Sequence, residues 1–404
     1  MKSIIIINQY IGSPYHGMEY RHYYLAKNLI EKGYRVTLIS GSYSHLFSTL
    51  PIVKENFTKE KIDGIDYIWV KIPKYSSSKS IGRIWNMLYF SWKLKFLKGL
   101  QPSHIIVSSP SLFPIRYGYG LAKKFRTKLF FEVRDIWPLT LIELSNLSNT
   151  HPLIKFMSYY EKFAYKKSDK IISLLPTAIE HFKINGMNYN KSIYLPNGIE
   201  IEEISKSPLA KKLISQIPKD KFLIAYSGTV GIANNLDYLV DVAELLKDNK
   251  DIYFIVLGKG GEKERLQNKV NTLNLENFLF LDAITKKQVG VFLESIDVAF
   301  ISLLPEKIFR FGVSPNKVFD YMYAKKPIIW AIEAGNNLVK EASCGMSVPL
   351  DHTLLLKETI LKLNRLSSES LKKLGENGYN FVIKNHSYQE LSKKLIRVIE
   401  EENV

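Results

Sequence analysis

Residues 312–322 read Gly-Val-Ser-Pro-Asn-Lys-Val-Phe-Asp-Tyr-Met, and residues 327–332 follow as Pro-Ile-Ile-Trp-Ala-Ile. Ser314 is expected to cap a helix and Pro315 to occupy its first position, where the missing N–H of proline costs nothing. An apolar stripe of Val318, Phe319 and Met322 then indicates that one side of the helix is buried. Proline at 327 cannot continue a helix, and the apolar run after it is typical of a buried strand. This stretch therefore predicts loop, helix and strand in an α/β fold.

The same helix carries residues suited to an anionic ligand. Free N–H groups at a helix N-terminus attract a phosphate, and Ser314, Asn316 and Lys317 lie around that end. Asp320 follows one turn later, where its carboxylate can accept hydrogen bonds from sugar hydroxyls. The alternative is a solvated Lys317 and an acid at 320 on the helix surface, and spacing alone leaves both interpretations open.

Two glycine turns add to this phosphate hypothesis. The first, Gly228-Thr229-Val230-Gly231, follows a predicted strand at 222–227, and the second, Gly258-Lys259-Gly260-Gly261, follows one at 252–257. Backbone N–H groups at neighbouring strand ends can bind phosphate oxygens, and a lysine adds positive charge. We therefore predict phosphate contacts from Gly228, Thr229, Gly231, Lys259 and Gly260.

The first half begins as a second α/β unit. A strand at 4–7, a loop at 8–17, a helix at about 19–31 and a strand at 35–40 give a Rossmann-like order. The run lacks G-x-G-x-x-G and no acid closes the second strand, so a dinucleotide is not expected there. Glycines permit close approach of a ligand to the loop backbone. Candidate ligand-contacting residues in and after this loop are Gly12, His16, Gly17, Glu19 and Arg21, although a lone loop histidine is more often simply exposed.

A further candidate follows a predicted strand at 128–133. Arg134 and Asp135 belong to the run E-V-R-D-I-W-P at residues 132–138. Loops at the carboxyl ends of parallel strands are where open α/β sheets bind ligands, so this pair is a candidate for contact with a sugar or phosphate. The alternative is a buried Arg134–Asp135 pair that only holds the loop.

Two of these runs resemble one family. The residues from Ser314 to Pro327 resemble the S-P-x-K-x-F-E-Y-M-A-x-x-K-P helix of retaining family 4 glycosyltransferases with the GT-B fold, in the WbuB-like branch of bacterial O-antigen and exopolysaccharide synthesis. The run E-V-R-D-x-W-P resembles the same branch, which often has histidine where Arg134 stands. This chain departs from the wider family in having Asp320 for glutamate and Gly312 for an acid.

The resemblance implies two Rossmann-like domains that face each other across a cleft. The expected divisions are residues 1–200, residues 201–384, and a last helix at 385–404 that crosses back to the first domain. The turn Pro196-Asn197-Gly198 would mark the start of the linker, which continues through Lys206. In related enzymes the loop at Ala283 and Ile284 contacts the nucleobase through its backbone, and the first glycine loop faces the donor sugar and the acceptor. The resemblance therefore implies that Gly12, His16, Gly17, Glu19 and Arg21 lie on the acceptor side.

Charge is unevenly distributed along the 404 residues. The net charge is +17, and residues 1–200 hold 28 Lys/Arg against 13 Asp/Glu, whereas residues 201–404 hold 28 against 26. A basic first half indicates an anionic membrane or nucleic acid, and no nucleic-acid-binding motif supports the latter. Residues 81–98 form a basic aromatic pattern typical of an interfacial helix. A crossover helix packed on its sheet, and a generally lysine-rich surface, remain alternatives.

The resemblance implies a retaining glycosyltransferase that uses a nucleoside-diphosphate sugar, with UDP expected, and a glycan acceptor on a polyprenyl diphosphate. Arg134, Asp135, Lys317 and Asp320 are the expected catalytic residues. No Asp-x-Asp motif is present, so neither a metal nor another cofactor is expected. One cysteine and no apolar run of membrane length favour a cytoplasmic protein. The lipid-linked acceptor that the resemblance implies would place its basic first domain at the inner leaflet. The alternatives are a UDP-sugar 2-epimerase and a noncatalytic subunit that binds sugar nucleotide or carrier lipid.

Overall fold

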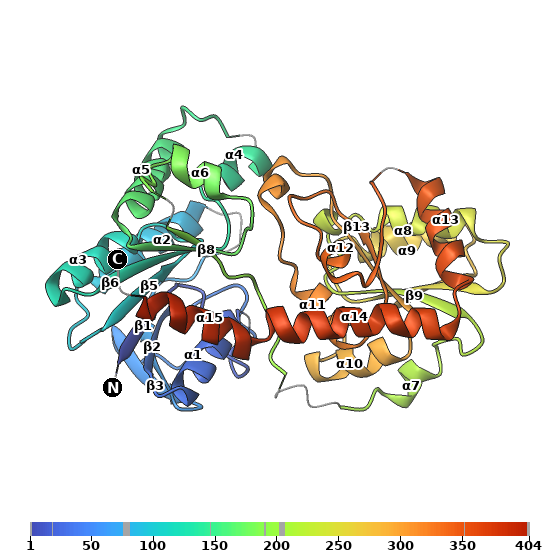
Figure 1. Ribbon diagram of the computed structural model, residues 1–404, viewed down its shortest axis with the longest axis horizontal. Coiled ribbons are helices and arrows are strands. Elements are labelled where there is room, and N and C mark those ends of the chain that lie inside the picture. Colours follow the sequence, from blue (N-terminus) through green and yellow to red (C-terminus); the bar gives the residue numbers. More distant parts are fainter. Residues whose placement is uncertain are drawn as a thin grey trace. The chain divides into compact units, whose positions relative to one another are not determined.

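The computed structural model describes residues 2–17, 19–75, 81–145, 147–189, 191–201, 207–350 and 352–401. These residues form two compact units (Figure 1). Unit 1 comprises Met1–Asn197 with Tyr388–Val404, and unit 2 comprises Gly198–Ser387. The predicted boundaries between the domains, after residues 200 and 384, lie three residues from the observed ones, after Asn197 and Ser387. Lys206, expected within the linker, lies outside the described residues.

Unit 1 is built on an eight-stranded sheet in the order β3-β4-β2-β1-β5-β6-β7-β8. All neighbouring pairs are parallel except β3 and β4, which form an antiparallel hairpin. Buried isoleucines fill the centre of β1, as expected for a parallel strand covered on both faces. The strands are β1 (Ser3–Ile7), β2 (Arg35–Gly41), β3 (Phe57–Ile62), β4 (Ile65–Val70), β5 (His104–Ser108), β6 (Lys128–Val133), β7 (Lys170–Ser173) and β8 (Ser192–Tyr194).

Helices cover both faces of this sheet. One face is covered by α1 (Arg21–Glu31) and α15 (Tyr388–Glu400), whose Tyr24 and Tyr388 rings lie 5.2 Å apart. The opposite face carries α3 (Ile115–Phe125), which approaches so closely that a Cβ on Gly118 would lie 2.6 Å from Val107. The other helices of the unit are α2 (Ile81–Leu94), α4 (Leu139–Ser145), α5 (Pro152–Lys167) and α6 (Ile179–Ile184).

Unit 2 has a six-stranded parallel sheet in the order β11-β10-β9-β12-β13-β14. Its strands are β9 (Phe222–Ser227), β10 (Ile252–Leu257), β11 (Phe278–Leu281), β12 (Val298–Ser302), β13 (Ile328–Ala331) and β14 (Gly345–Ser347). Its helices are α7 (Lys211–Ile214), α8 (Asp237–Leu245), α9 (Lys263–Thr272), α10 (Lys286–Glu294), α11 (Asn316–Tyr323), α12 (Leu338–Ala342), α13 (Thr353–Asn364) and α14 (Ser368–His386), with short 3₁₀ turns at Ile232–Asn234 and Lys307–Phe311.

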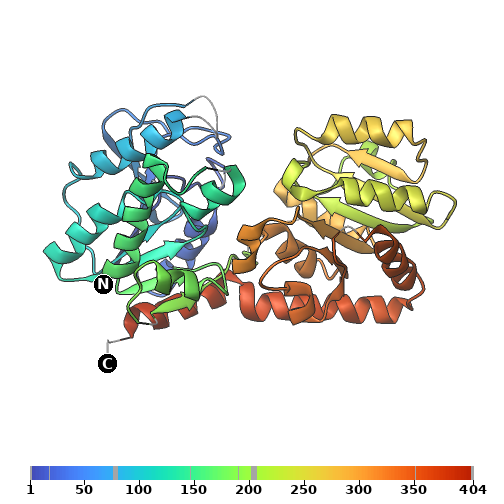
Figure 2. The ribbon, with the colours of Figure 1, turned by 90° about the horizontal axis from the view of Figure 1, so that it is seen from above.

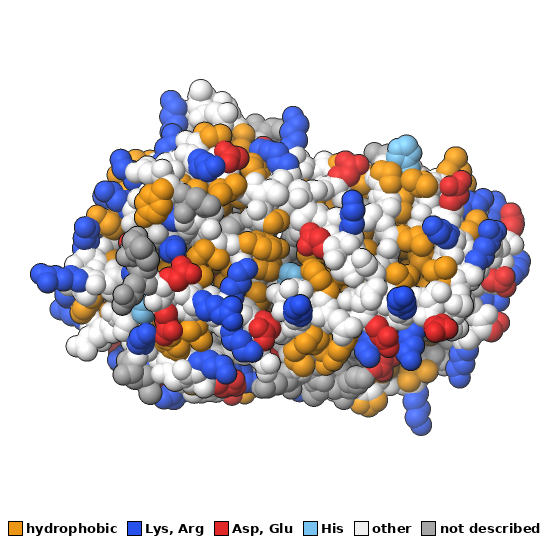
Figure 3. All heavy atoms as spheres, in the orientation of Figure 1, with side chains coloured by type: hydrophobic (Ala, Val, Ile, Leu, Met, Phe, Trp, Pro, Cys, Tyr) orange, Lys and Arg blue, Asp and Glu red, His pale blue; other side chains and the backbone are white. Residues whose placement is uncertain are grey.

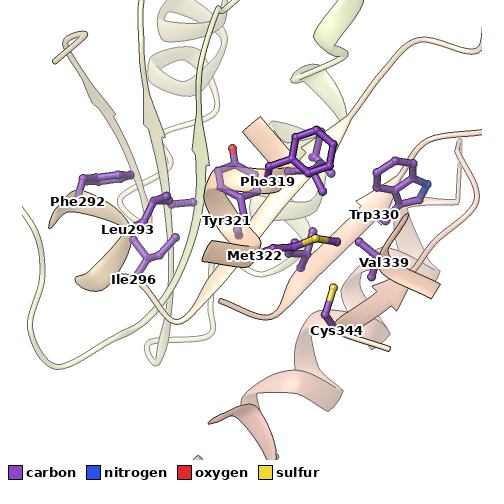
Figure 4. Close-up of a cluster of buried hydrophobic side chains, with 14 of the residues drawn as sticks. Phe292, Leu293, Ile296, Phe319, Tyr321, Met322, Trp330, Val339 and Cys344 are labelled. Atoms are coloured by element: carbon purple, nitrogen blue, oxygen red, sulfur yellow. The ribbon is translucent and has the colours of Figure 1, made fainter. Parts of the chain in front are cut away.

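A separate apolar cluster lies on each face of the unit 2 sheet. Side chains of α8, α9 and α13 form one cluster, and those of α10, α11, α12 and α14 form the other. Figure 4 shows the second cluster, in which Phe319 and Met322 of α11 lie near Trp330 of β13. The predicted apolar stripe of α11 is therefore its buried face, and this packing fixes the orientation of Lys317 on the helix.

Several element boundaries differ from those expected. The first helix begins at Arg21 instead of Glu19, and α2 ends at Leu94 instead of Lys98. The strand β3, the hairpin partner of β4, was not expected, because its Thr-Lys-Glu-Lys sequence is polar. Within the described residues, no helix is long and apolar enough to span a membrane.

Candidate functional site

The two glycine turns of unit 2 pack directly against each other at the carboxyl ends of β9 and β10. A Cβ on Gly258 would lie 1.9 Å from the carbonyl oxygen of Gly228, and a Cβ on Gly260 would lie 2.0 Å from that of Val230. The N–H of Val230 donates to the carbonyl of Lys259 at 2.9 Å. These glycines are therefore required for contact between the loops, a role that the sequence analysis did not assign to them.

Other amides in these turns are available to a ligand. In the part of the chain that the structure describes, the N–H groups of Thr229, Gly231, Lys259 and Gly260 donate to no protein acceptor. Lys259 itself is exposed. The turns can thus provide backbone donors and one cation at the strand ends, as the phosphate hypothesis requires.

Lys317 extends from the first turn of α11 across these turns. Its Nζ donates to Oδ1 of Asn234 at 2.8 Å and to the hydroxyl of Tyr226, and it lies 4.3 Å from the centre of the Tyr226 ring. A Cβ on Gly228 would lie 3.2 Å from this Nζ. Glycine at 228 therefore leaves room for the ammonium group.

The partners of Lys317 are polar but uncharged. Among the described residues, no carboxylate forms an ion pair with its Nζ. Burial lowers the pKa of Lys317 to about 8, because a desolvated ammonium is less stable than one in water. A partly buried cation without an acidic partner gains charge compensation when an anion binds beside it.

The start of α11 differs from the prediction in one respect. Pro315 occupies the cap position in an extended conformation, the helix begins at Asn316, and no side chain caps it, so Ser314 as cap is wrong. Proline at the cap places the helix start one residue later than expected. The first amides of α11 have no helical partners, as at any helix N-terminus, and they lie in the same turn as Lys317.

Asp320 lies one turn after Lys317 on α11, and the predicted nucleobase loop immediately precedes α10. Both carboxylate oxygens of Asp320 accept from Nζ of Lys286, an ion pair that the sequence analysis did not foresee. Ala283 is exposed, and Ile284 is partly buried against the core just before α10. The structure therefore places these residues in unit 2, and their contacts with a ligand remain predictions.

In unit 1, a buried ionic network surrounds Glu132. Its carboxylate accepts from Nε of Arg21 at 2.9 Å, pairs with Nε2 of His22 at 2.6 Å, and accepts from the hydroxyl of Ser108 at 2.7 Å. Burial would raise the pKa of Glu132, but Arg21 and His22 hold it well below its usual range. Arg21 is itself buried and also donates to the carbonyl of Leu195 at 2.9 Å. Arg21 is therefore a structural residue, contrary to its predicted place on an open acceptor side.

His16 and Gly17 are also internal. His16 is buried against the Trp69 ring, with the ring centres 4.9 Å apart, and its Nδ1 lies 2.8 Å from the hydroxyl of Ser13. Gly17 has a φ of +110°, and a Cβ there would lie 2.8 Å from the amide nitrogen of Ser48. Gly12 is buried, and its carbonyl accepts from the hydroxyl of Tyr67 at 2.9 Å. The aromatic β4 packs over this loop, which explains why these three residues are not open to a ligand.

Glu19, Arg134 and Asp135 are the predicted unit 1 residues that retain solvent access. Arg134 forms an ion pair with Glu19, and its backbone N–H donates to the hydroxyl of Ser109 at 2.9 Å. The side chain of Asp135 is exposed. Desolvation by the surrounding protein nevertheless raises the pKa of its carboxyl group, whereas the positive charges of Arg134 and Arg83 lower it. The pairing of Arg134 with Glu19, in place of Asp135, was not expected.

Two family models together match most of the chain. The description "Glycosyltransferase Family 4" applies to residues 15–203, and "Glycosyl transferases group 1" applies to residues 210–381. The chain belongs to glycosyltransferase family 4. The predicted family and the predicted two-domain α/β fold are confirmed.

Several known glycosyltransferases are similar to this family 4 enzyme. WcaI of Escherichia coli K12, which bears the name "Putative colanic acid biosynthesis glycosyl transferase", is 23% identical over 187 residues, or 45% of this chain and 46% of WcaI. The alignment therefore spans less than half the length of that relative. The structure of Anabaena HepE in complex with UDP and glucose has a TM-score of 0.66 at 14% identity, covering 99% of each chain. WaaG, a glycosyltransferase involved in lipopolysaccharide biosynthesis, has a TM-score of 0.67 at 13% identity, covering 99% of this chain and 100% of WaaG. These structural similarities establish the GT-B fold of this glycosyltransferase.

Three residues that surround Lys317 and the first glycine turn were not identified from the sequence. Tyr226 and Asn234 hold the Lys317 ammonium, and the hydroxyl of Tyr321 bonds both backbone groups of Ser227 at 2.9 and 3.0 Å. Tyr226 and Tyr321 had been assigned only to a strand and a helix. Asn234 follows the first glycine turn closely, which was the one signal that could have drawn attention to it.

Proposed function

We propose that this glycosyltransferase transfers a sugar, with retention of anomeric configuration, from a UDP-sugar to a glycan on a polyprenyl diphosphate in bacterial surface polysaccharide synthesis. The observation that carries the donor half of this proposal is the Lys317 ammonium, which is held by neutral partners and lacks a carboxylate among the described residues. A diphosphate supplies the missing negative charge. The complex of HepE with UDP and glucose and the name of WcaI support the choice of donor and of pathway.

The chemistry required of unit 2 is stabilisation of a leaving group. As the glycosidic bond to the diphosphate breaks, negative charge develops on the departing oxygen, and donors already in place lower the barrier. We assign this role to Lys317 and to the amides of the two glycine turns and α11, with Lys259 at the edge. Ser314 and Asn316 would lie beside the phosphates, Ala283 and Ile284 beside the base, and Asp320 would orient sugar hydroxyls.

The reaction is proposed to proceed without a bound metal or other cofactor. The sequence has no Asp-x-Asp motif to hold a cation, and Lys317 can neutralise phosphate charge directly. Transfer should therefore persist after extensive dialysis against EDTA. A loss of transfer that added Mg²⁺ or Mn²⁺ restores would overturn this part of the proposal.

The acceptor is proposed to be lipid-linked, and α2 supports this choice. Trp85, Trp92 and Phe96 along and just after α2 are 67%, 49% and 54% exposed, although large aromatic side chains are normally buried. Asn86, Met87, Phe90 and Leu94 form its buried side. The helix therefore both packs on unit 1 and presents aromatic rings outward, as expected at the cytoplasmic surface of the inner leaflet. Glu19, Arg134 and Asp135 would contact the acceptor or the transferred sugar.

The test is incubation of the protein with a panel of radiolabelled nucleotide sugars and bacterial lipid extract. Incorporation of label into the organic phase with one UDP-sugar is the expected result, and the anomeric configuration of the product tests retention. Release of free epimerised sugar would instead support an epimerase. Tight binding of nucleotide sugar without turnover in any extract would support a noncatalytic subunit.

A further inference from the structure

A long segment of unit 1 contains no acidic residue. Residues 67–131 include twelve Lys/Arg and no Asp or Glu. The segment contains α2 and α3, so neither helix has an acid of its own to neutralise its cations. On α3 and at its C-terminus, the exposed cations are Arg116, Lys123, Lys124 and Arg126.

The neighbouring helix α5 presents the same charge. Its four lysines, Lys155, Lys162, Lys166 and Lys167, are all exposed. Its single acid, Glu161, is 2% exposed and is bonded to Nε2 of His181 at 2.7 Å. The outer surface of α3 and α5, here called the α3–α5 face, therefore shows eight cations and no carboxylate from these helices.

Four of the eight cations of the α3–α5 face lie beside aromatic rings, namely Arg116, Lys123, Lys124 and Lys167. The guanidinium of Arg116 lies 4.7 Å from the Phe163 ring centre, and its Nη1 donates to the hydroxyl of Tyr159 at 2.8 Å. Within the described chain, none of the eight cations forms an ion pair with a carboxylate. Contact with a neutral ring leaves the full positive charge available to an external partner.

The opposite face of unit 1 has a different charge pattern. There, α15 and its surroundings hold the ion pairs Lys2–Glu400 at 2.8 Å and Lys393–Glu390 at 2.6 Å. On α15 the exposed cations Lys394 and Arg397 share the helix with the exposed carboxylate of Glu400. The α3–α5 face differs because no exposed carboxylate of α3 or α5 accompanies its eight cations.

This face also carries exposed aromatic side chains and lies on the same side of the sheet as α2. Phe156 and Tyr159 are 42% and 54% exposed. Helix α2 connects β4 to β5, α3 connects β5 to β6, and α5 lies between β6 and β7, so all three connections run toward the β8 edge of the sheet. Because such connections between parallel strands are right-handed, all three helices lie on one face of the sheet (Figure 2). In Figure 3, Lys and Arg side chains succeed one another along the upper left edge, over α5 and α3.

We propose that the α3–α5 face is a docking surface for an anionic phospholipid membrane. Cations within a few ångströms of such a surface are attracted electrostatically, and Phe156 and Tyr159 can enter the headgroup region. The exposed rings favour a membrane over nucleic acid, since α2 on the same side presents tryptophans where a lipid interface would place them. The inference extends the proposed lipid-linked acceptor, because it brings unit 1 to the surface in which such an acceptor resides.

The test compares two charge-reversal variants of the whole chain in vesicle co-sedimentation. The first is Lys124→Glu with Lys162→Glu and Lys166→Glu. The matched control is Lys362→Glu with Lys372→Glu and Lys373→Glu, which are exposed residues of unit 2 and give the same change in net charge. With vesicles of phosphatidylglycerol and phosphatidylcholine, we expect the first variant to lose at least roughly tenfold in partitioning and the control less than about twofold. Equal losses in both variants, or undiminished binding of the first, would overturn the proposal.

Further measurements separate this proposal from its alternatives. The double variant Phe156→Ser with Tyr159→Ser should bind these vesicles more weakly than the wild type at high salt. Salt screens the attraction between charges but does not prevent insertion of the rings. Binding of the wild type to single-stranded or duplex DNA with no binding to anionic vesicles would reject a membrane partner. UDP binding by each variant, measured by calorimetry, reports an intact unit 2. If the wild type binds vesicles but not UDP, the proposed donor fails and the docking surface stands.

Discussion

Nζ of Lys317 lies 2.8 Å from Oδ1 of Asn234, so the first turn of α11 is joined to the end of the loop after β9 across 83 residues of sequence. Asn234 is held in turn by Ser302, whose hydroxyl donates to the Asn234 carbonyl at 2.6 Å. The lysine is thus positioned by rigid neutral groups above Gly228. An amine held in this way is ready to bind an anion without reorganising the protein.

Replacing Lys317 by methionine should abolish most of the transferase activity while the protein remains folded. Methionine keeps much of the apolar stem but cannot neutralise a diphosphate, and loss of one charged donor of this kind costs roughly 100- to 1,000-fold in turnover. Steady-state transfer and UDP affinity are the measurements. The control is Lys340→Met on the exposed side of α12, which should leave both unchanged. Transfer at the wild-type rate by Lys317→Met would refute the assigned role.

UDP affinity should decrease as the pH rises above about 8, the pKa of Lys317 in the empty site. Only the protonated amine attracts the diphosphate, so the affinity should fall by up to about tenfold per pH unit above that value. Binding at pH 8.5 should take up protons, which calorimetry in buffers of different ionisation enthalpy detects. Lys317→Arg keeps its charge over this range and should show no such dependence. An identical pH profile for Lys317→Arg and the wild type would assign the titration to another group.

The same shift has a consequence for the empty protein. The unfolded chain binds this proton with an ordinary lysine pKa near 10.4, whereas the folded site binds it more weakly. Between about pH 8 and 10.4 the unfolded state therefore holds more protons, and the contribution of Lys317 to the free energy of unfolding increases with pH. A bound diphosphate should reduce this increase, because it raises the pKa of the lysine.

Gly258→Ala should destabilise unit 2 by about 1–3 kcal/mol or more, because the added Cβ would lie 1.9 Å from the carbonyl oxygen of Gly228 and overlap it. Gly261→Ala is the matched control in the same turn, because a Cβ there meets nothing within 4 Å. Hydrogen exchange of β9 and β10 amides reports the stability of this unit separately. Equal protection in both variants would show that the two turns do not pack as described.

Glu132→Gln should destabilise unit 1 by about 3 kcal/mol or more, because it leaves the buried Arg21 guanidinium without its counter-charge. Glu180→Gln, whose side chain is 69% exposed, should have little effect. The pKa of Glu132 lies well below its usual value, so its contribution to stability is present above pH 4.5 and is lost as the pH falls through the folded pKa. Urea titrations followed by exchange of β5 and β6 amides, at pH 7 and at low pH, measure both effects.

The sequence predicted the architecture and the position of Lys317 because both depend on local pattern. Apolar runs followed by glycine turns define β9 and β10, and the stripe on α11 orients its lysine. The partners of Lys317 could not be predicted in the same way. Tyr226 and Asn234 are separated from it by 91 and 83 residues, and only the folded sheet brings them together.

The acceptor-side residues show where sequence reasoning failed. The pattern predicts an accessible arginine at the start of a helix, yet Arg21 bonds Glu132, which is 111 residues away. His16 is covered by Trp69 of a strand that lies 53 residues later in the chain. Burial of a polar group depends on long-range partners that satisfy it, and a local pattern carries no information about them.

Trp85→Ser combined with Lys95→Glu should reduce flotation of the protein with anionic liposomes, because the change removes an exposed ring on α2 and reverses a charge just after its C-terminus. Met87 and Phe90, which anchor α2 to unit 1, are untouched, so the fold should be retained. The control is Ile232→Ser with Lys340→Glu, which removes an exposed apolar side chain and reverses a charge in unit 2. If flotation is unchanged in the α2 variant but is lost when the cations of the α3–α5 face are reversed, membrane contact is assigned to α3 and α5 alone. Unchanged flotation of both would leave the outward aromatic rings of α2 without a role at the membrane.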